Sequence, residues 1–390
     1  MKILVLGANG FVGKNLVSAL ENIKNGKDRR FPELIIDEIM TYDIDSPEGT
    51  LPKYLSDADF IFNFAGVNRP KDDSEFMVGN CDFLSEVLDI LRHTGNTCPV
   101  VLSSSIQASL EGRFAGSAYG LSKKAGEDLL IKYSEETSAR VMVYRFPNIF
   151  GKWARPNYNS AVATFCNNIA NDLPITVSDE KIELELLYID DLVEEMLCCL
   201  MKKEHRVTKY SRFCTVPVTH KVTLGEIVNL LESFRSFPET LMMPSIAQGS
   251  FAYKLYSTYL SYLPKDKAIH GFDTKSDSRG SFTEIMKSID KGQFSVNVSL
   301  PLETKGNHWH HSKWEIFLVV SGKALIKMRK IGCDDTAEYV VSGDKLEAVY
   351  MLPGYTHSIT NLSDKENLVT LMWANETFDP GRPDTYFEEV

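Results

Sequence analysis

The chain opens with Met1-Lys-Ile-Leu-Val-Leu6, and Gly7-Ala-Asn-Gly-Phe-Val-Gly13 follows directly. The apolar run predicts a buried strand, and the three glycines predict a tight turn into a helix. Backbone without side chains can approach a pyrophosphate, whose charge is favoured by the N–H groups that open the helix. An ordinary strand-to-helix turn is the alternative, but three glycines directly after an apolar strand favour a dinucleotide site. Its predicted cofactor-binding residues are Gly7, Asn9, Gly10, Phe11, Val12 and Gly13.

Length, charge and cysteine content limit the classes of protein that this chain can represent. With 390 residues it exceeds the size at which one core stops growing, so two domains are expected. A net charge of −11 without a Lys/Arg-rich block argues against nucleic acid or an anionic membrane as partner. The seven cysteines lack paired metal spacing, and no apolar stretch approaches the length of a membrane span. We therefore expect a soluble, cytoplasmic protein without disulfides and with a small-molecule ligand.

Apolar strands alternate with helical stretches over the first 150 residues, which is the pattern of a parallel sheet with crossover helices. Thr223-Leu-Gly-Glu226 is a capping box that predicts the start of a further helix, in a smaller lobe that would cover the substrate. We expect this first domain to occupy residues 1–245. Its predicted strands are Ile35–Tyr42, Phe60–Phe64, Val100–Leu102 and Val141–Tyr144, and its predicted helices include Ser85–His93 and Ser122–Glu136.

A different pattern begins near residue 246. An aromatic run from Tyr253 to Tyr262 predicts a connecting helix within residues 246–270. Beyond it, short apolar segments are separated by Gly, Pro, Asp and Asn, which predicts an all-β barrel or double-sheet roll over residues 271–390. The predicted strands there are Ser281–Met286, Gln293–Leu300, Phe317–Val320, Ala324–Arg329, Ala337–Val341, Leu346–Met351, Ser358–Thr360 and Leu368–Trp373.

Tyr119 and Lys123 stand four residues apart at the start of a predicted helix, hence on one face. Free tyrosine has a pKa near about 10, but a neighbouring ammonium favours the phenolate and brings the hydroxyl into the range of acid/base chemistry. A carbonyl held by Ser105 and Tyr119 over a nicotinamide could accept hydride and proton together. Tyr-x-x-x-Lys alone is a weak signal, but here it follows the glycine turn, Asn63-Phe-Ala-Gly66 and Ser103-Ser-Ser105 in order.

With this ordered series, residues 1–245 resemble the extended short-chain dehydrogenase/reductase family, in its branch of nucleotide-sugar epimerases, dehydratases and reductases. Arg145-Phe-Pro-Asn-Ile-Phe-Gly151 and Tyr188-Ile-Asp-Asp191 look like later signatures of that family. The resemblance implies that Tyr119 is the acid/base, that Lys123 orients the ribose and tunes Tyr119, and that Ser105 binds the reacting oxygen. The residues that it adds to the cofactor site are Ala65, Gly66 and Lys123.

Asp43 follows the second predicted strand, where a carboxylate would bind both ribose hydroxyls and repel a 2′-phosphate. This residue therefore favours NADH. It lies about thirty residues past the glycines instead of about twenty, so a loop such as Asn22–Arg30 must be inserted. Arg29 and Arg30 precede the strand, at its wrong end for a 2′-phosphate. The alternative reading is a solvated loop acid.

Four of the eight histidines fall between residues 308 and 357. His308 and His310 alternate, so on a strand both imidazoles point to one face. Glu315 follows closely, and His357 supplies a third imidazole from a distant strand. Three imidazoles and a carboxylate suit Zn, Fe, Mn or Ni with room for water or substrate, and the alternative is a set of surface histidines. The predicted metal ligands are His308, His310, Glu315 and His357.

This segment resembles the cupin family through His308-x-His310-x4-Glu315-x6-Gly322 and Gly354-x2-His357-x3-Asn361. Arg279-Gly-Ser-Phe-Thr-Glu284 and Lys305-Gly-Asn-His308 also resemble metal-free sugar-epimerase cupins, in which a histidine abstracts a proton next to a ketone. His308 therefore fits two readings. The register of the other three ligands favours a metal.

The chain as a whole resembles the bifunctional capsular polysaccharide and O-antigen enzymes that join these two folds. The segments that carry this resemblance include Asn68-Arg-Pro70, Gly151-Lys-Trp153, Gly306-Asn-His-Trp-His-His311 and Pro383-Asp-Thr-Tyr-Phe387. It implies a UDP-4-keto-6-deoxy-N-acetylhexosamine on the way to UDP-N-acetyl-L-fucosamine, epimerised at carbon 3 by the cupin and then reduced at carbon 4 with NADPH. It also implies a zinc ion and a homodimer. The alternative is a nucleotide-sugar epimerase or dehydratase that keeps its NAD bound and uses the cupin for binding or dimerisation.

Overall fold

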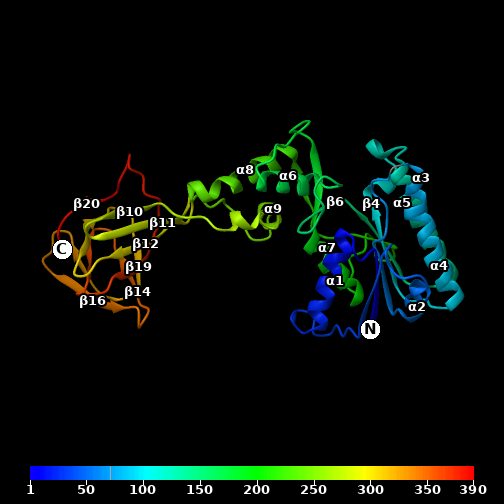
Figure 1. The fold of residues 1–390 in the computed structure, drawn as a ribbon, viewed down its shortest axis with the longest axis horizontal. Helices are drawn as coiled ribbons and strands as arrows, with labels where there is room; N and C mark the ends of the chain where they lie inside the picture. Colours follow the sequence, from blue (N-terminus) through cyan, green and yellow to red (C-terminus); the bar gives the residue numbers. More distant parts are fainter. Residues whose placement is uncertain (71) are drawn as a thin grey trace. The chain divides into compact units, whose positions relative to one another are not determined.

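The computed structural model describes residues 1–70 and 72–390, which divide into two compact units (Figure 1). Unit 1 comprises Met1–Leu231 and Gly249–Leu263, and unit 2 comprises Glu232–Gln248 and Pro264–Val390. The chain enters unit 2 at Glu232 and returns to unit 1 at Gly249 before it leaves unit 1 after Leu263. The domain boundaries expected at residues 245 and 270 stay predictions. Among the described residues, none of the helices has both the length and the apolarity needed to cross a bilayer. All seven cysteines are free.

Unit 1 is built on a six-stranded sheet in the order β2-β1-β3-β4-β5-β8, and all neighbouring strands in it are parallel. Strands occur at all four predicted places, so the prediction of a parallel sheet is confirmed. The strands are β1 (Lys2–Leu6), β2 (Glu38–Tyr42), β3 (Phe60–Asn63), β4 (Val100–Ser105), β5 (Val141–Phe146) and β8 (Phe213–Cys214).

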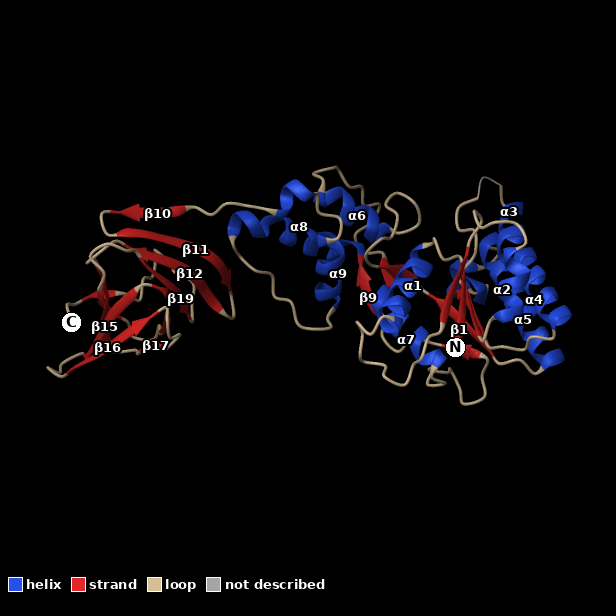
Figure 2. Cartoon of the chain, turned by 60° about the horizontal axis from the view of Figure 1, so that its bottom comes forward, coloured by secondary structure: helices blue, strands red, loops and turns tan. Residues whose placement is uncertain are grey.

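Helices cover both faces of this sheet, with α1 and α7 against one face and α2, α4 and α5 against the other (Figures 1 and 2). Ile3 and Val5 of β1 therefore enter one core and Leu4 and Leu6 the other, which explains why the strand is a continuous apolar run. The helical segments are α1 (Phe11–Lys24), α2 (Thr50–Asp57), α3 (Ser74–Met77), the π-helical η1 (Val78–Asp82), α4 (Phe83–Thr94), the 3₁₀ turns η2 (Ile106–Ser109) and η3 (Gly112–Phe114), α5 (Ala118–Thr137) and α7 (Ile189–Leu200).

The strand order places the ligand crevice. The chain runs from β1 to β2 on one side and then crosses to β3 on the other side of β1. In open parallel sheets the crevice lies outside the carboxyl ends of the strands at such a reversal. The glycine turn after β1 and the segment after β3 meet there.

A second lobe of unit 1 contains a three-stranded sheet, β6-β7-β9, the helices α6 and α9, and the first part of α8, whose residues from Glu232 on belong to unit 2. The predicted connecting helix is α9. It packs against α6, and its buried Lys254 donates to Asp191 Oδ2 (2.6 Å) at the start of α7, so this helix is anchored within unit 1. The bounds are β6 (Asn148–Phe150), α6 (Ala161–Ala170), β7 (Glu183–Tyr188), β9 (His220–Thr223), α8 (Leu224–Thr240) and α9 (Phe251–Leu260).

Unit 2 contains two antiparallel sheets, β10-β11-β12-β19-β14-β17 and β16-β15-β18-β13-β20, so the predicted double-sheet roll is confirmed (Figure 2). No helix lies within residues 271–390, all of which are described. The short η4 (Lys265–Ala268) precedes strands β10 (Thr274–Asp277), β11 (Gly280–Ser288), β12 (Gly292–Ser299), β13 (Thr304–Trp309), β14 (Glu315–Ser321), β15 (Lys323–Lys330), β16 (Thr336–Ser342), β17 (Ala348–Met351), β18 (Tyr355–Asn361), β19 (Leu368–Ala374) and β20 (Tyr386–Phe387).

The predicted capping box at the start of α8 is confirmed by two reciprocal hydrogen bonds. Glu226 N donates to Thr223 Oγ1 (3.1 Å), and Thr223 N donates to Glu226 Oε2 (2.6 Å). Thr223→Ala removes the cap and should lower the free energy of unfolding by about 1 kcal/mol, whereas Thr223→Ser keeps the hydroxyl and should stay close to the parent. Urea unfolding of the two variants measures this. Equal destabilisation by both would mean that the methyl group, and not the cap, is what matters.

Candidate active sites

The predicted glycine turn brings the ends of β1 and β3 into backbone contact. Gly7 has a φ of +76°, and a Cβ on it would lie 2.6 Å from Ala65 N, so no larger residue fits there. Gly10 is the N-cap of α1, and Phe11, Val12 and Gly13 form its first turn. The N–H groups of a helix start therefore face the crevice, as a pyrophosphate requires.

Asp43 directly follows β2 and faces the same turn. Its Oδ2 accepts a hydrogen bond from the backbone N of Asn9 (2.7 Å). The side-chain Nδ2 of Asn9 donates to Asp45 Oδ1 (3.0 Å). Two carboxylates therefore stand beside the turn, and Asp45 was not identified from the sequence. The long spacing between the glycine turn and Asp43 is explained by a loop of residues 25–37, which separates α1 from β2. Arg30 in that loop pairs with Asp28 (2.7 Å).

The structure brings Ser105, Tyr119 and Lys123 together. Ser105 ends β4, and Tyr119 lies in the first turn of α5, which the Ser117 hydroxyl caps by accepting from Gly120 N (3.1 Å). Lys123 is buried, and its Nζ donates to Ser103 O (3.1 Å) and lies 5.8 Å from the centroid of the Tyr119 ring. A Cβ on Gly66 would lie 3.0 Å from this Nζ, so the predicted cofactor residue and the lysine are neighbours.

Protonation in this cluster differs from the expectation based on charge alone. Burial raises the pKa of Tyr119 to about 12. The hydrogen bond with Ser105 lowers this pKa, but by less than burial raises it. Burial also lowers the pKa of Lys123 to about 8, against a raising by Glu127. Desolvation therefore outweighs the expected stabilisation of a phenolate by Lys123, whose Nζ is directed at a backbone carbonyl. Tyr119 is a neutral hydroxyl near pH 7 and can donate a proton.

Glu127 continues the face of α5 that carries Tyr119 and Lys123, and the sequence did not single it out. Its carboxylate is fully buried and accepts from Ser104 Oγ (2.6 Å). The Arg145 guanidinium binds it with two hydrogen bonds, Nε to Oε1 (2.8 Å) and Nη2 to Oε2 (2.6 Å). Since Ser104 lies on β4 and Arg145 on β5, these bonds fix the register of α5 against the two strands next to the site.

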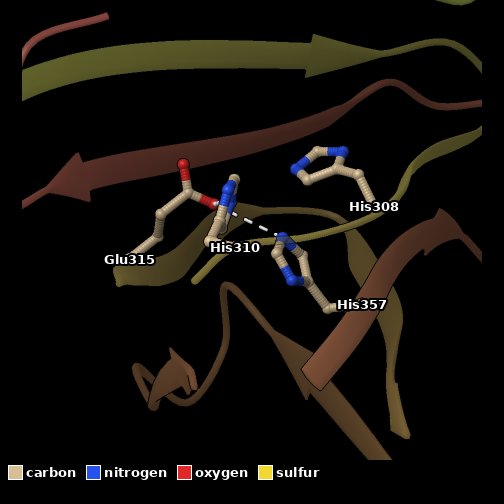
Figure 3. Close-up of side chains that lie close together, drawn as sticks. All are labelled: His308, His310, Glu315 and His357. Atoms are coloured by element: carbon tan, nitrogen blue, oxygen red, sulfur yellow. Dashed lines mark ion pairs between the residues drawn. The ribbon is translucent and has the colours of Figure 1, made fainter. Parts of the chain in front are cut away.

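In unit 2 the four predicted metal ligands converge, as Figure 3 shows, and their ligand atoms all lie within 4.8 Å of one another. Glu315 Oε2 lies 3.5 Å from His310 Nε2 and 3.4 Å from His357 Nε2. Both of these nitrogens are buried, and neither has a hydrogen-bond partner among the described residues. Buried polar atoms without a partner are costly, so these two nitrogens fit a site built to bind an ion.

The other ring nitrogen, Nδ1, of His310 and of His357 faces a backbone carbonyl. His310 Nδ1 is hydrogen-bonded to the carbonyl of Asp384, and His357 Nδ1 lies 3.4 Å from the carbonyl of Tyr355. A carbonyl accepts only, so Nδ1 is the donor to it and Nε2 is the ring nitrogen that faces the cluster. Burial lowers the pKa of His308 to about 4, so this imidazole is neutral near pH 7. The four side chains fit a divalent ion with nitrogen and oxygen ligands.

A cavity of about 260 Å³ opens beside Glu315. Lys313, which lines it, pairs with Glu315 Oε1 (3.1 Å), the oxygen that does not face the imidazoles. Apart from Glu315, the sequence did not identify the cavity residues as part of a site, although Lys313 stands only two positions before that predicted ligand. The lining combines charged, polar and aromatic side chains, which are suited to a sugar: Lys275, Phe282, Glu284, Gln293, Ser295, Lys313, Glu315, Met372, Trp373, Ala374, Glu376 and Phe378.

Comparison with known proteins agrees with both halves of this description. The sequence profile of the NAD dependent epimerase/dehydratase family matches residues 3–211. The chain belongs to this family. A second profile, the polysaccharide biosynthesis C-terminal domain, matches residues 275–386. The expected short-chain dehydrogenase/reductase-type fold of the first domain is thereby confirmed.

Relatives with both domains cover the full chain. The chain is 40% identical over 386 residues to the UDP-2-acetamido-2,6-beta-L-arabino-hexul-4-ose reductase of Pseudomonas aeruginosa, covering 99% of this chain and 98% of that protein. It is 47% identical to the capsular polysaccharide assembling protein CapF from Staphylococcus aureus, whose crystal structure matches with a TM-score of 0.89 over 100% of both chains. The UDP-glucuronic acid 4-epimerase of Bacillus cereus, solved with NAD, shares the fold of 67% of this chain and covers 98% of its own, at 18% identity and a TM-score of 0.52.

Tyr119→Phe should lower the rate of NAD(P)H oxidation with a UDP-4-keto sugar by a factor of about one hundred or more, because no proton donor then remains beside the forming alkoxide. Steady-state kinetics measures the effect. Tyr210→Phe is the matched control, since Tyr210 is 87% exposed. Activity of Tyr119→Phe within a few-fold of the control would refute this role.

Proposed function

We propose that this protein is a bifunctional nucleotide-sugar enzyme of capsule or O-antigen synthesis. Its cupin domain would epimerise carbon 3 of a UDP-4-keto-6-deoxy-N-acetylhexosamine, and its first domain would reduce carbon 4 with NAD(P)H. The observation that carries this proposal is the 40% identity to a reductase of such a sugar over 99% of the chain. Its support is that both the Tyr119 cluster and the histidine cluster are complete in the same chain.

In the reductase domain a bound nicotinamide supplies a hydride to the carbonyl carbon. The chain's own part is to hold the carbonyl oxygen and to supply the proton. Ser105 and Tyr119 are hydrogen-bonded to each other and would both contact this oxygen. Because Tyr119 is neutral near pH 7, its hydroxyl proton moves to the oxygen as the alcohol forms. Lys123, beside Gly66, would bind the ribose and fix the position of the cofactor.

In the cupin domain we propose zinc as the metal, held by His308, His310, Glu315 and His357. A bound divalent cation stabilises negative charge on a carbonyl oxygen and so makes the neighbouring C–H acidic. The cavity beside the cluster would hold the sugar. Glu284 and Lys313 line it and are groups that could exchange protons with carbon 3. Reduction of the epimer would then draw the epimerisation forward.

A second candidate function is a 4-epimerase or dehydratase that retains NAD and returns the hydride. The family match and the shared fold with a 4-epimerase solved with NAD favour it. Purified protein would then carry bound nicotinamide and consume none. The homodimer and the cytoplasmic location expected from the sequence stay predictions.

The epimerase proposal predicts proton exchange without any nicotinamide. In deuterated water, Tyr119→Phe protein should label carbon 3 of the 4-keto sugar, whereas His357→Ala and His308→Ala should not, because each removes a side chain that would hold the cation needed to make this C–H acidic. Proton NMR and mass spectra of the sugar measure this, and metal analysis should give about one divalent ion per chain.

His270→Ala is the control for that experiment, since His270 is exposed and outside the cluster. Full exchange by metal-free protein would favour a histidine base without metal. Exchange that survives in His308→Ala would remove His308 from the mechanism, and absence of exchange in every variant would refute the epimerase proposal.

Asp43 predicts the choice of nicotinamide. Its carboxylate, with Asp45 beside it, should repel a 2′-phosphate, so kcat/KM with NADH should at least equal that with NADPH. Asp43→Asn should shift the ratio toward NADPH, and Glu48→Gln, an exposed carboxylate of the same loop, should not. A strong preference of the unaltered protein for NADPH would show that Asp43 does not contact the ribose or that its charge is neutralised there.

A further inference from the structure

The last strand of the chain returns to the metal cluster. β20 pairs with β13, so that Phe387 lies opposite His308 and Tyr386 opposite Trp309, and Glu388 N donates to Asn307 O (3.0 Å). We call residues 384–389 the strap. We propose that the strap is a working part of the metal centre, with Asp384 as a positioning residue that holds the ligands of the ion in place. This inference rests on the metal-dependent function proposed above.

The main chain of Asp384 acts on one ligand directly. Its carbonyl oxygen is the hydrogen-bond partner of His310 Nδ1, and the hydroxyl of Thr385 lies 3.4 Å from the same nitrogen. His310 is only 1% exposed, so no solvent competes for this contact. A carbonyl at Nδ1 fixes both the tautomer and the rotation of the ring, and so aims Nε2 at the ion.

The side chain of Asp384 acts on the turn between two ligands. Its Oδ1 accepts from His311 N (2.9 Å), and its Oδ2 accepts from Ser312 N (2.8 Å) and Lys313 N (3.0 Å). These three successive N–H groups form the turn that leads from His310 to Glu315. A single carboxylate therefore sets the shape of the turn, and with it the separation of a ligand imidazole from the ligand carboxylate.

The other end of the strap is tied to β18, which carries the third imidazole, and to the neighbouring strand β15. Arg329 Nη2 on β15 donates to Glu388 Oε1 (3.0 Å) and Glu389 O (2.7 Å). The hydroxyl of Thr356, the neighbour of His357 on β18, donates to the carbonyl of Glu388. The strap thus joins the strand of His308 to the strand of His357.

The strap has little part in the hydrophobic core of unit 2. Tyr386 and Phe387 are 43% and 78% exposed, and the buried apolar cluster of this unit includes no residue of the strap. Tyr386 makes ring contacts with Trp309 (5.1 Å between centroids) and His311 (5.0 Å), and the other contacts of the strap are polar and concentrate on ligand residues and their neighbours. Loss of the Asp384 side chain should therefore leave the fold in place and loosen the geometry of the cluster. Partners of metal-binding imidazoles typically contribute about 10–100-fold to metal affinity.

The test measures zinc affinity of the full-length protein by competition with a chromogenic chelator. We expect Asp384→Ala to weaken zinc binding by about 10–100-fold and Asp384→Asn, which keeps one acceptor oxygen, to fall between it and the parent. Asp364→Ala is the matched control, because Asp364 is an exposed carboxylate of the same unit outside the strap. Excess zinc should restore carbon-3 exchange in Asp384→Ala.

A thermal unfolding midpoint for each metal-free protein separates positioning from folding. We expect the midpoints of Asp384→Ala and Asp364→Ala to agree. If the parent binds zinc tightly and Asp384→Ala binds it equally well, the strap has no such role. A midpoint that falls in step with affinity would make Asp384 a structural residue and would also overturn the inference. A parent that binds no zinc at all would instead refute the proposed metal function.

Discussion

The first site depends on the close approach of β1 and β3, which is possible because Gly7 has no side chain. Its missing Cβ would lie 2.6 Å from Ala65 N. With the strands in this contact, the segment after β3 runs beside Lys123, so the turn that would hold a dinucleotide adjoins the helix that carries Tyr119 and Lys123. A larger residue at position 7 would separate both parts together.

Burial, more than charge, sets the chemistry of that arrangement. Tyr119 stays neutral and Lys123 loses part of its basicity because both are removed from water. The buried pair of Glu127 and Arg145 then keeps the same helix in register. Such a pair contributes less to stability than to geometry, because the cost of desolvating two charges offsets most of their attraction. The main contribution of the Glu127–Arg145 pair is therefore to fix the position of α5, and its contribution to stability is smaller.

One strand of unit 2 has polar residues at the inward positions, where a double sheet normally has apolar ones. On β12 the inward positions are polar: Gln293, Ser295, Asn297 and Ser299 are all buried. Polar groups inside a double sheet cost free energy unless they have partners. Gln293 and Ser295 line the cavity beside Glu315, so this part of the interior is hollow and polar, whereas the apolar cluster that includes Phe317 and Ile326 is packed.

Much of this protein could be predicted from local sequence. The apolar runs of unit 1, the glycine turn and the capping box at Thr223 depend on spacing within short segments, and spacing decides which side chains share a face. Spacing also places His308 and His310 on one face, whereas His357 was predicted from a separate motif and meets them only in the fold. Other features join residues far apart in the chain. Asp45 meets Asn9, Glu127 meets Arg145, and Asp384 meets the turn after His310 only because the fold places them together. The direction of the pKa shift at Tyr119 also required the tertiary structure, since a sequence shows the neighbouring charge but not the loss of water that outweighs it.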